Sequence, residues 1–240
     1  MALTPPAAYR DGMPSPRWFD RASLSLGIGV PVLYFLTQAV IGVLTPGYSF
    51  RQQAASDLGV GDSIRATVFN LGAISTGVLA TGAAYGLAAA PRWSPVPVVR
   101  ARLTALAVAS TGAAAIAAGV FPLPDPRHGG GPIGAGMFVI PLLMATLLWR
   151  AASPLVRGYL GLNLALFAGC AAMLSGTTPV DQVANGGLLQ RVLAVTVFGA
   201  IGVGCAIVTA TRSDGTQVAG REGGKSSLPR SRVSRWTAQR

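Results

Sequence analysis

Long apolar segments, separated by short polar stretches, make up most of this chain. Six segments contain no Asp, Glu, Lys, Arg or His, and they cover residues 24–44, 66–90, 103–121, 132–149, 158–176 and 192–211. A helix of about 20 apolar residues crosses the roughly 30 Å hydrocarbon core of a bilayer. Backbone groups inside lipid must be hydrogen-bonded within their own segment, and the alternating pattern of a membrane barrel is missing. The pattern therefore predicts an all-α polytopic membrane protein, a six-transmembrane-helix bundle.

Turn-forming residues in the connections divide the chain into three regions. The membrane domain is predicted at 24–211, after a polar N-terminal tail at 1–23, and the basic tail at 212–240 is predicted to be disordered. The segment at 24–44 is longer than the core of a signal peptide and no small-residue cleavage motif follows it, so we interpret it as the first span. The fourth segment is the shortest, and Pro141 is expected to kink it.

Charge is sparse along the chain and unevenly distributed. Charged residues make up 11% of the chain, against about a quarter in soluble domains, so most of the surface is expected to face lipid. When six spans are threaded through a membrane, fifteen of the nineteen Lys and Arg residues fall on the side of the two termini. The opposite side holds four arginines, balanced by four aspartates. The positive-inside rule then places both termini in the cytoplasm (N-in/C-in) of a multi-pass protein of the plasma (inner) membrane.

The net charge of +11 does not indicate a nucleic-acid partner. The basic residues lie in connections and in a tail, and they form no stripe along a soluble domain. The predicted partner is the lipid bilayer. The tail from Arg212 to Arg240 is rich in basic residues, and we expect it to contact anionic lipid heads at the cytoplasmic leaflet.

The polar residues on the side opposite the termini are the candidates for a functional site. Each of the three connections there brings at least one carboxylate and one arginine, and the helix ends of one bundle can converge. We expect Asp57, His128 and Arg191 to face one extracytoplasmic cavity. The full set of predicted binding residues is Arg51, Ser56, Asp57, Arg65, Asn70, Asp125, His128, Asp181 and Arg191.

Several polar and small residues have structural roles that we favour over catalysis. Ser56 or Asp57 can cap a short helix ahead of the second span. Asn70 lies one turn inside that span, where its amide can hydrogen-bond to a neighbouring helix. Gly82 and Gly86 form a GxxxG motif that is typical of close helix packing in membranes.

Asp57, His128 and Asp181 are the candidate catalytic residues, and with Asp125 they are the weak candidates for a metal site of hydrolytic type. His128 is the only histidine and the chain has no HExxH motif, so no cofactor is predicted and the sequence leans against an enzyme. Structural pairings explain the same residues: His128 with Asp125 or a lipid phosphate, and Asp181 with Arg191 in an ion pair that tethers a loop.

Three short motifs resemble a known membrane family. They are Ser56-Asp57-Leu58-Gly59 followed by Phe69-Asn70, Phe121-Pro122 followed by Asp125 and His128-Gly129, and Gly187-Leu188-Leu189-Gln190-Arg191 at the opening of the last span. Over about residues 24–211 the chain is similar to the bacterial and archaeal family known as domain of unknown function 998. The resemblance implies a six-helix membrane protein and carries no activity. The second outer connection is short and Gly-rich here, which departs from the family pattern.

Three functions are compatible with these features. The first is a non-catalytic role in lipid handling, envelope maintenance or partner binding through an outward-facing polar pocket. The first alternative is a membrane-embedded, metal-dependent hydrolase that acts at the outer membrane surface. The second alternative is a small-solute transporter, although no ionisable residue lies in the middle of a span, where coupling sites usually sit.

Overall fold

The computed structural model describes residues 18–150 and 152–210, and this part of the chain contains helices and no strand. Six helical spans are long and apolar enough to cross a membrane, so the predicted six-span, all-α fold is confirmed. The α-helices are α2 (Trp18–Leu44), α3 (Ile64–Ala89), α4 (Val98–Val120), α5 (Ile140–Leu148), α6 (Pro154–Leu174) and α7 (Gln182–Ala210). Three 3₁₀ helices accompany them: η1 (Ala55–Gly59), η2 (Ala90–Arg92) and η3 (His128–Phe138).

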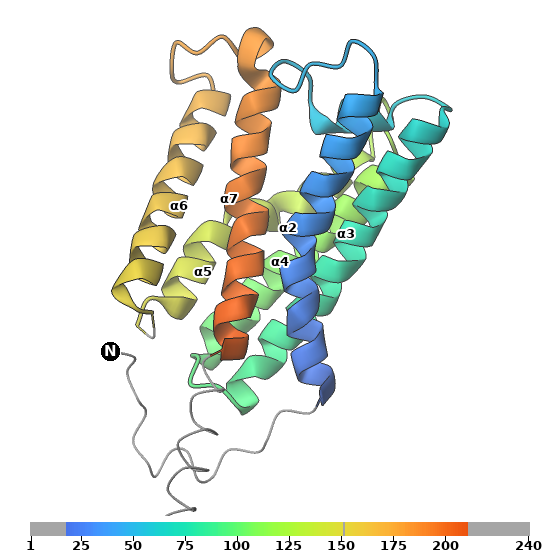
Figure 1. Ribbon diagram of the computed structural model, residues 1–240. Helices are drawn as coiled ribbons and strands as arrows, with labels where there is room; N and C mark the ends of the chain where they lie inside the picture. The colour runs from blue at the N-terminus through green and yellow to red at the C-terminus, as the bar shows by residue number, and fades with distance from the viewer. Residues whose placement is uncertain (1–17, 151, 211–240) are drawn as a thin grey trace, which may run out of the picture.

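The spans run side by side, and the two ends of the described chain, Trp18 and Ala210, lie at the same end of the bundle (Figure 1). This arrangement follows from an even number of spans. We call this end the proximal end, and the other the distal end. The distal end is formed by the connections 45–63, 121–127 and 175–181.

Most of the helices begin earlier than the apolar segments predict, α2 and α7 by the largest margins. α2 starts at Trp18 where the apolar segment starts at 24, and α7 starts at Gln182 where the segment starts at 192. Hydropathy marks the part of a helix that crosses hydrocarbon, whereas the helix itself continues into the polar zone. Asp181 starts α7, because its Oδ1 accepts hydrogen bonds from the backbone N–H groups of residues 183 and 184 at 2.9 and 3.0 Å.

The fourth span departs from the single kinked helix predicted at 132–149. Its distal half is η3, where Gly129, Gly130 and Gly131 have φ angles of 73°, 70° and 53°, a left-handed backbone that residues with a side chain rarely adopt. α5 begins after η3, and Pro141 stands in its first turn, where the missing N–H costs no hydrogen bond. The proline therefore starts a helix and does not bend one. The left-handed glycines lie at the start of η3, and η3 meets α5 at Val139.

Helix α4 supports the broken segment. The hydroxyl of Ser110 donates a hydrogen bond to the carbonyl of Ile133 and accepts one from the N–H of Gly136 at 3.0 Å. Unpaired backbone groups are costly in hydrocarbon, so these bonds make the break tolerable. Gly134 lets η3 lie close on α4, since a Cβ at this position would stand 3.1 Å from the Cβ of Ala114.

Small residues also let the first three spans pack closely. Gly77 of α3 and Gly112 of α4 meet backbone to backbone, because a Cβ on Gly77 would overlap the carbonyl of Gly112. Gly86 of the GxxxG motif faces α2, and a Cβ there would stand 2.8 Å from the backbone nitrogen of Leu24. Gly82, the other glycine of the motif, also faces α2. The predicted packing role of this motif is confirmed.

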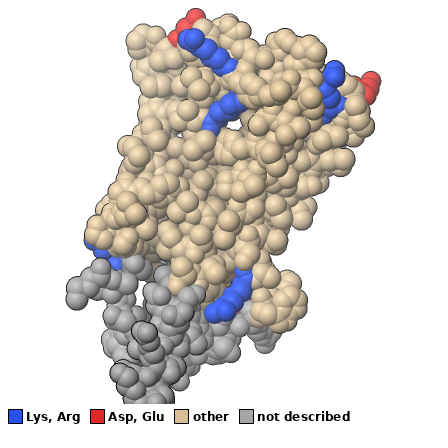
Figure 2. Space-filling view, in the orientation of Figure 1, with Lys and Arg blue, Asp and Glu red and all other residues tan. Residues whose placement is uncertain are grey.

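The outer surface suits a bilayer. In the view of Figure 2 the belt midway between the two ends shows no charged side chain, acidic side chains appear only at the distal end, and basic ones appear at both ends. Large apolar side chains point outward from this belt, among them Val32, Leu36, Val78, Leu106 and Leu162. Such a surface would be unfavourable in water and is stable against lipid tails.

Candidate functional site

A pocket of about 270 Å³ lies among α2, α3, α4 and α7, next to η1 and η3. Its walls are mostly apolar and include the rings of Phe69 from α3 and Phe198 from α7. Five polar side chains without a permanent charge also line it: Tyr34, Ser56, Thr111, His128 and Gln190. No Asp, Glu, Lys or Arg is found in its lining within the described chain.

The broken fourth span creates this pocket. η3 packs on α4, whereas α7 packs against α2, α5 and α6, so space remains between η3 and α7. The wall on α4 is formed by Ala114, Ala115 and Ala118, whose methyl groups leave that space unfilled.

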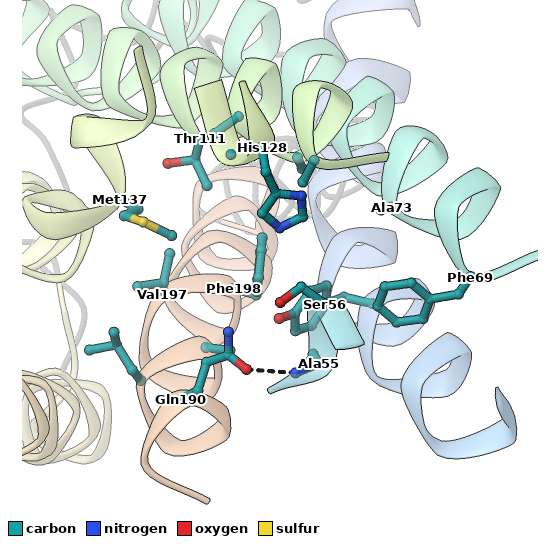
Figure 3. A pocket seen from close by; sticks show the side chains of 17 residues that line it. Ala55, Ser56, Phe69, Ala73, Thr111, His128, Met137, Gln190, Val197 and Phe198 are labelled. Atoms are coloured by element: carbon teal, nitrogen blue, oxygen red, sulfur yellow. Dashed lines mark hydrogen bonds between the residues drawn. The ribbon is translucent and has the colours of Figure 1, made fainter. Parts of the chain in front are cut away.

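His128 stands at the beginning of η3, and its ring points into the pocket toward Ser56 (Figure 3). Its Nδ1 lies 2.9 Å from the backbone carbonyl of Phe121. A carbonyl oxygen can only accept a hydrogen bond, so in the neutral ring Nδ1 carries the proton and Nε2 keeps a lone pair. The Phe121 carbonyl thus fixes both the orientation of the ring and its tautomer.

Three hydrogen bonds hold η1, which carries Ser56, against the bundle. The Asp57 carboxylate accepts from the N–H of Ala54 at 2.9 Å, so the predicted cap of a short helix is formed by Asp57. Asn70 donates from its amide to the carbonyl of Gly59 at 3.0 Å, and its partner is therefore this connection rather than a neighbouring helix. The third bond runs from the N–H of Ala55 to Gln190.

The orientation of the Gln190 amide follows from that third bond. The N–H of Ala55 donates to Oε1 of Gln190 at 2.7 Å, because an N–H requires an oxygen acceptor. The amide nitrogen is consequently turned away from η1 and into the pocket (Figure 3). Within the described chain, neither this nitrogen nor the hydroxyl of Ser56 has a protein hydrogen-bond partner.

Arg191 has a different role, since it fastens the 45–63 connection to α7. Its guanidinium donates to the carbonyls of Phe50, Gln53 and Gly187 at 2.8, 3.0 and 2.8 Å, and to the hydroxyl of Tyr48. Burial raises the pKa of Tyr48, and the neighbouring Arg191 opposes that shift. The ring of Phe50 lies 5.0 Å from the guanidinium carbon, which adds a cation–π contact.

Asp125 and Arg127 form a two-pronged ion pair on the 121–127 connection. Nε of the Arg127 guanidinium donates to Oδ1 of Asp125 at 3.0 Å, and Nη2 donates to Oδ2 at 2.7 Å. This pairing lowers the pKa of Asp125 to about 2 and raises the pKa of Arg127. The guanidinium carbon of Arg127 also lies 3.9 Å from the centre of the Phe121 ring. Both charged groups therefore stabilise the conformation of this turn.

The structure separates the sequence-predicted site residues into two groups. Only Ser56 and His128 line the pocket, so the cavity expected to be shared by Asp57, His128 and Arg191 is lined by one of the three. The other predicted binding residues hold connections together or face outward, and they are Arg51, Asp57, Arg65, Asn70, Asp125, Asp181 and Arg191.

The interactions that the sequence predicted for these charged residues also differ from the interactions observed. Arg191 bonds to carbonyls and Asp181 to backbone N–H groups, so the tethering ion pair between them is not formed. Asp125 pairs with Arg127, and the ring of His128 is hydrogen-bonded to a carbonyl. Over residues 18–150 and 152–210, no group of three or more His, Cys, Asp or Glu side chains could hold a metal ion.

Sequence reasoning missed Tyr34, Thr111 and Gln190 as parts of the site. Tyr34 and Thr111 lie inside apolar segments, where a hydroxyl is most often accommodated by its own helix, as Thr111 is by the carbonyl of Ala107 at 3.0 Å. Gln190 offered a usable signal, because an amide just before a predicted span is placed at the polar edge of a membrane.

One comparison with known proteins gives a match. The model of a family described as "Protein of unknown function (DUF998)" matches residues 28–209, which is most of the chain. No curated protein gives a significant match, and no solved structure does.

Proposed function

The chain belongs to the DUF998 family, which supplies no activity, and from its geometry we propose that it is a membrane protein that binds an uncharged amphiphile. The ligand is a lipid whose head carries hydroxyl or ester groups and no net charge, such as a diacylglycerol. Its head lies near Ser56, His128 and Gln190, and an acyl chain lies along the apolar walls. Lipid handling is one of the non-catalytic roles that the sequence favoured, beside envelope maintenance and partner binding.

The composition of the pocket lining carries this proposal. The walls offer apolar surface from α3, α4 and α7, which suits a hydrocarbon chain. The three polar groups complement a neutral head: Nε2 of His128 accepts, the amide nitrogen of Gln190 donates, and the hydroxyl of Ser56 does both. An anionic head would favour Arg or Lys at the site, and the described lining contains neither.

The proposal includes an orientation, with both termini in the cytoplasm and the pocket in the outer half of the membrane. The proximal end of the described chain carries six arginines and one aspartate, the imbalance that the positive-inside rule associates with the cytoplasm. The arginines are Arg21, Arg92, Arg100, Arg102, Arg150 and Arg157. The predicted contact of the basic tail with anionic lipid heads lies outside the described residues.

The two alternative functions have less support in the geometry. A metal-dependent hydrolase built on Asp57, Asp125, His128 and Asp181 needs a shared metal, and these side chains form no such group in the part of the chain described. A transporter that couples to ions needs an ionisable group exposed to the path, and His128 is the only titratable side chain other than Tyr34 in the lining.

Photo-crosslinking tests the proposal. The full-length protein in lipid nanodiscs is exposed to a diacylglycerol that carries a diazirine in one acyl chain. We expect crosslinks on the α4 and α7 residues that line the pocket, and competition by unlabelled diacylglycerol but not by phosphatidic acid. Ala115→Trp fills the pocket and should abolish most of the crosslinking, whereas Ala165→Trp on the exposed face of α6 should leave it unchanged. Equal crosslinking of both variants, or stronger competition by phosphatidic acid, would contradict the proposal.

A further inference from the structure

We infer that the pocket cleaves an acyl ester of its lipid ligand, with Ser56 as the nucleophile and His128 as the general base. The inference rests on the proposed binding of an uncharged, ester-bearing lipid. It departs from the sequence expectation, which leaned against an enzyme and gave Asp57, His128 and Asp181 as the catalytic candidates. Its basis is that a hydroxyl, an imidazole and an amide N–H meet in one pocket whose walls are mostly apolar.

His128 has the arrangement required of a base. Nδ1 donates to the carbonyl of Phe121 at 2.9 Å, so the lone pair of Nε2 is directed into the pocket, toward Ser56 (Figure 3). In serine hydrolases a third group orients the histidine and stabilises the imidazolium once it forms. The Phe121 carbonyl dipole takes that position here, and it holds the ring without adding a charge.

Ser56 has the features of a nucleophile. Its hydroxyl lines the pocket and forms no hydrogen bond within the described chain, whereas the backbone around it is held by Asp57, Gln190 and Asn70. Ser56 and His128 face each other without a direct hydrogen bond. Such pairs commonly tighten when substrate enters, because catalytic bonds are often long in free enzymes.

Gln190 supplies the donor for the oxyanion. Its Oε1 is occupied by the N–H of Ala55, so the amide cannot turn around, and its N–H₂ group is presented to the pocket. A fixed donor aimed at the developing negative charge costs no reorganisation during reaction. The apolar walls increase its effect, because they lower the local dielectric constant.

The reaction consumes one ester and one water. Oγ of Ser56 forms a bond to the ester carbonyl carbon while its proton passes to Nε2 of His128, and the carbonyl oxygen becomes an oxyanion bonded to Gln190. The bond from carbon to the alkoxy oxygen then breaks, and His128 returns the proton to that oxygen, so an alcohol leaves. Water attacks the acyl group on Ser56 with His128 again taking the proton. Collapse of this second intermediate returns the proton to Oγ of Ser56 and releases a fatty acid.

Activity-based labelling tests the inference without knowledge of the natural substrate. The full-length protein in nanodiscs is treated with a long-chain alkyl fluorophosphonate, which phosphonylates activated serines, and the modified residue is located by mass spectrometry. We expect label on Ser56 and none on Ser56→Ala. His128→Gln should slow labelling about 100-fold, the usual contribution of a general base. Ser49→Ala, in the same connection but outside the pocket, should label like the wild type.

The diacylglycerol crosslinking assay on the same preparations separates the two ideas. Ser56→Ala should still crosslink, which shows that the pocket is folded when the label is lost. A wild-type protein that crosslinks but takes no label, or takes it on another serine, overturns the catalytic inference and leaves the binding proposal standing. A wild-type protein that neither crosslinks nor labels overturns both. Labelling of His128→Gln at the wild-type rate removes histidine from the mechanism and overturns the inference as stated.

Discussion

The charged and the uncharged polar side chains of the distal end have different roles, although some of them are neighbours in the sequence. The charged groups of Arg191 and Asp57 hydrogen-bond to backbone groups, and the carboxylate of Asp125 forms an ion pair with Arg127. The neighbouring residues Gln190 and Ser56 present unbonded polar atoms to the pocket. Charge at this end holds the connections in place, and the uncharged groups remain available to a ligand.

A physical reason underlies this division. A buried charge without a partner is costly, so at the edge of a membrane each charged group is stable only when carbonyls, N–H groups or an opposite charge surround it. A hydroxyl, a neutral imidazole or an amide can face an apolar pocket at far lower cost. Substitutions of Arg191, Asp57 and Asp125 should show what the charged group does, with effects that decrease in that order.

Arg191→Ala should cause the largest loss of stability. It removes hydrogen bonds to three carbonyls and to Tyr48, and we expect the free energy of unfolding to fall by about 3 kcal/mol, since bonds to charged groups are worth more than neutral ones. Thermal unfolding in detergent measures this. Arg65→Ala is the matched control, because Arg65 is exposed at the same end. Equal melting temperatures for the two variants would show that Arg191 does not fasten the connection.

Asp57→Ala should have a smaller effect on stability and a clear effect on the pocket. Loss of the bond to the N–H of Ala54 should cost about 1 kcal/mol, as for other helix caps. Ser56 is the preceding residue, so diacylglycerol crosslinking and fluorophosphonate labelling should fall more than stability does. Asp62→Ala in the same connection, where the side chain is exposed, provides the comparison. If both variants bind and label alike, η1 is positioned by other contacts.

The ion pair of Asp125 should give the smallest effect, visible as a dependence on pH. The pKa of this carboxyl in the folded protein is about 2, below its ordinary value of 3.8, so the pair contributes stability that is present above about pH 4. That contribution is lost as the pH falls through about 2. Carbon-13 chemical shifts of the Asp125 carboxyl should report the lowered midpoint, and Asp125→Asn should remove this titration. A midpoint near the ordinary value would mean that Arg127 does not hold the carboxylate in solution.

The number of spans was predictable because each span is decided locally. The transfer of about 20 apolar residues into hydrocarbon is favourable for each segment by itself, and the connecting prolines and glycines separate the segments. The same logic predicts that Trp18 and Ala210 lie at one end of the bundle. It also placed Ser56 and His128 among the candidates, since both lie at the polar edge of the membrane.

The roles of individual site residues were less predictable. Arg191 and Asp57 were chosen as site residues because they are charged, yet charge at a membrane edge is usually paired, and both are held by backbone groups. Gln190 was noted only as part of the motif at the opening of the last span, and it was not among the predicted site residues. The partner of Asn70 was expected on a helix, whereas the nearer polar group is a carbonyl of the folded connection.

Sequence alone therefore determined the six-span architecture of this DUF998 protein and the common end of its described termini, because both depend on the hydropathy of single segments. Only the tertiary structure decided that there is a pocket. The pocket is bordered by η3, which begins with the left-handed Gly129 to Gly131 and is bonded to Ser110 at Ile133 and Gly136, and by a wall of alanines on α4. These features depend on contacts between segments that are far apart in the sequence, and the hydropathy of a single segment does not determine which segments come into contact.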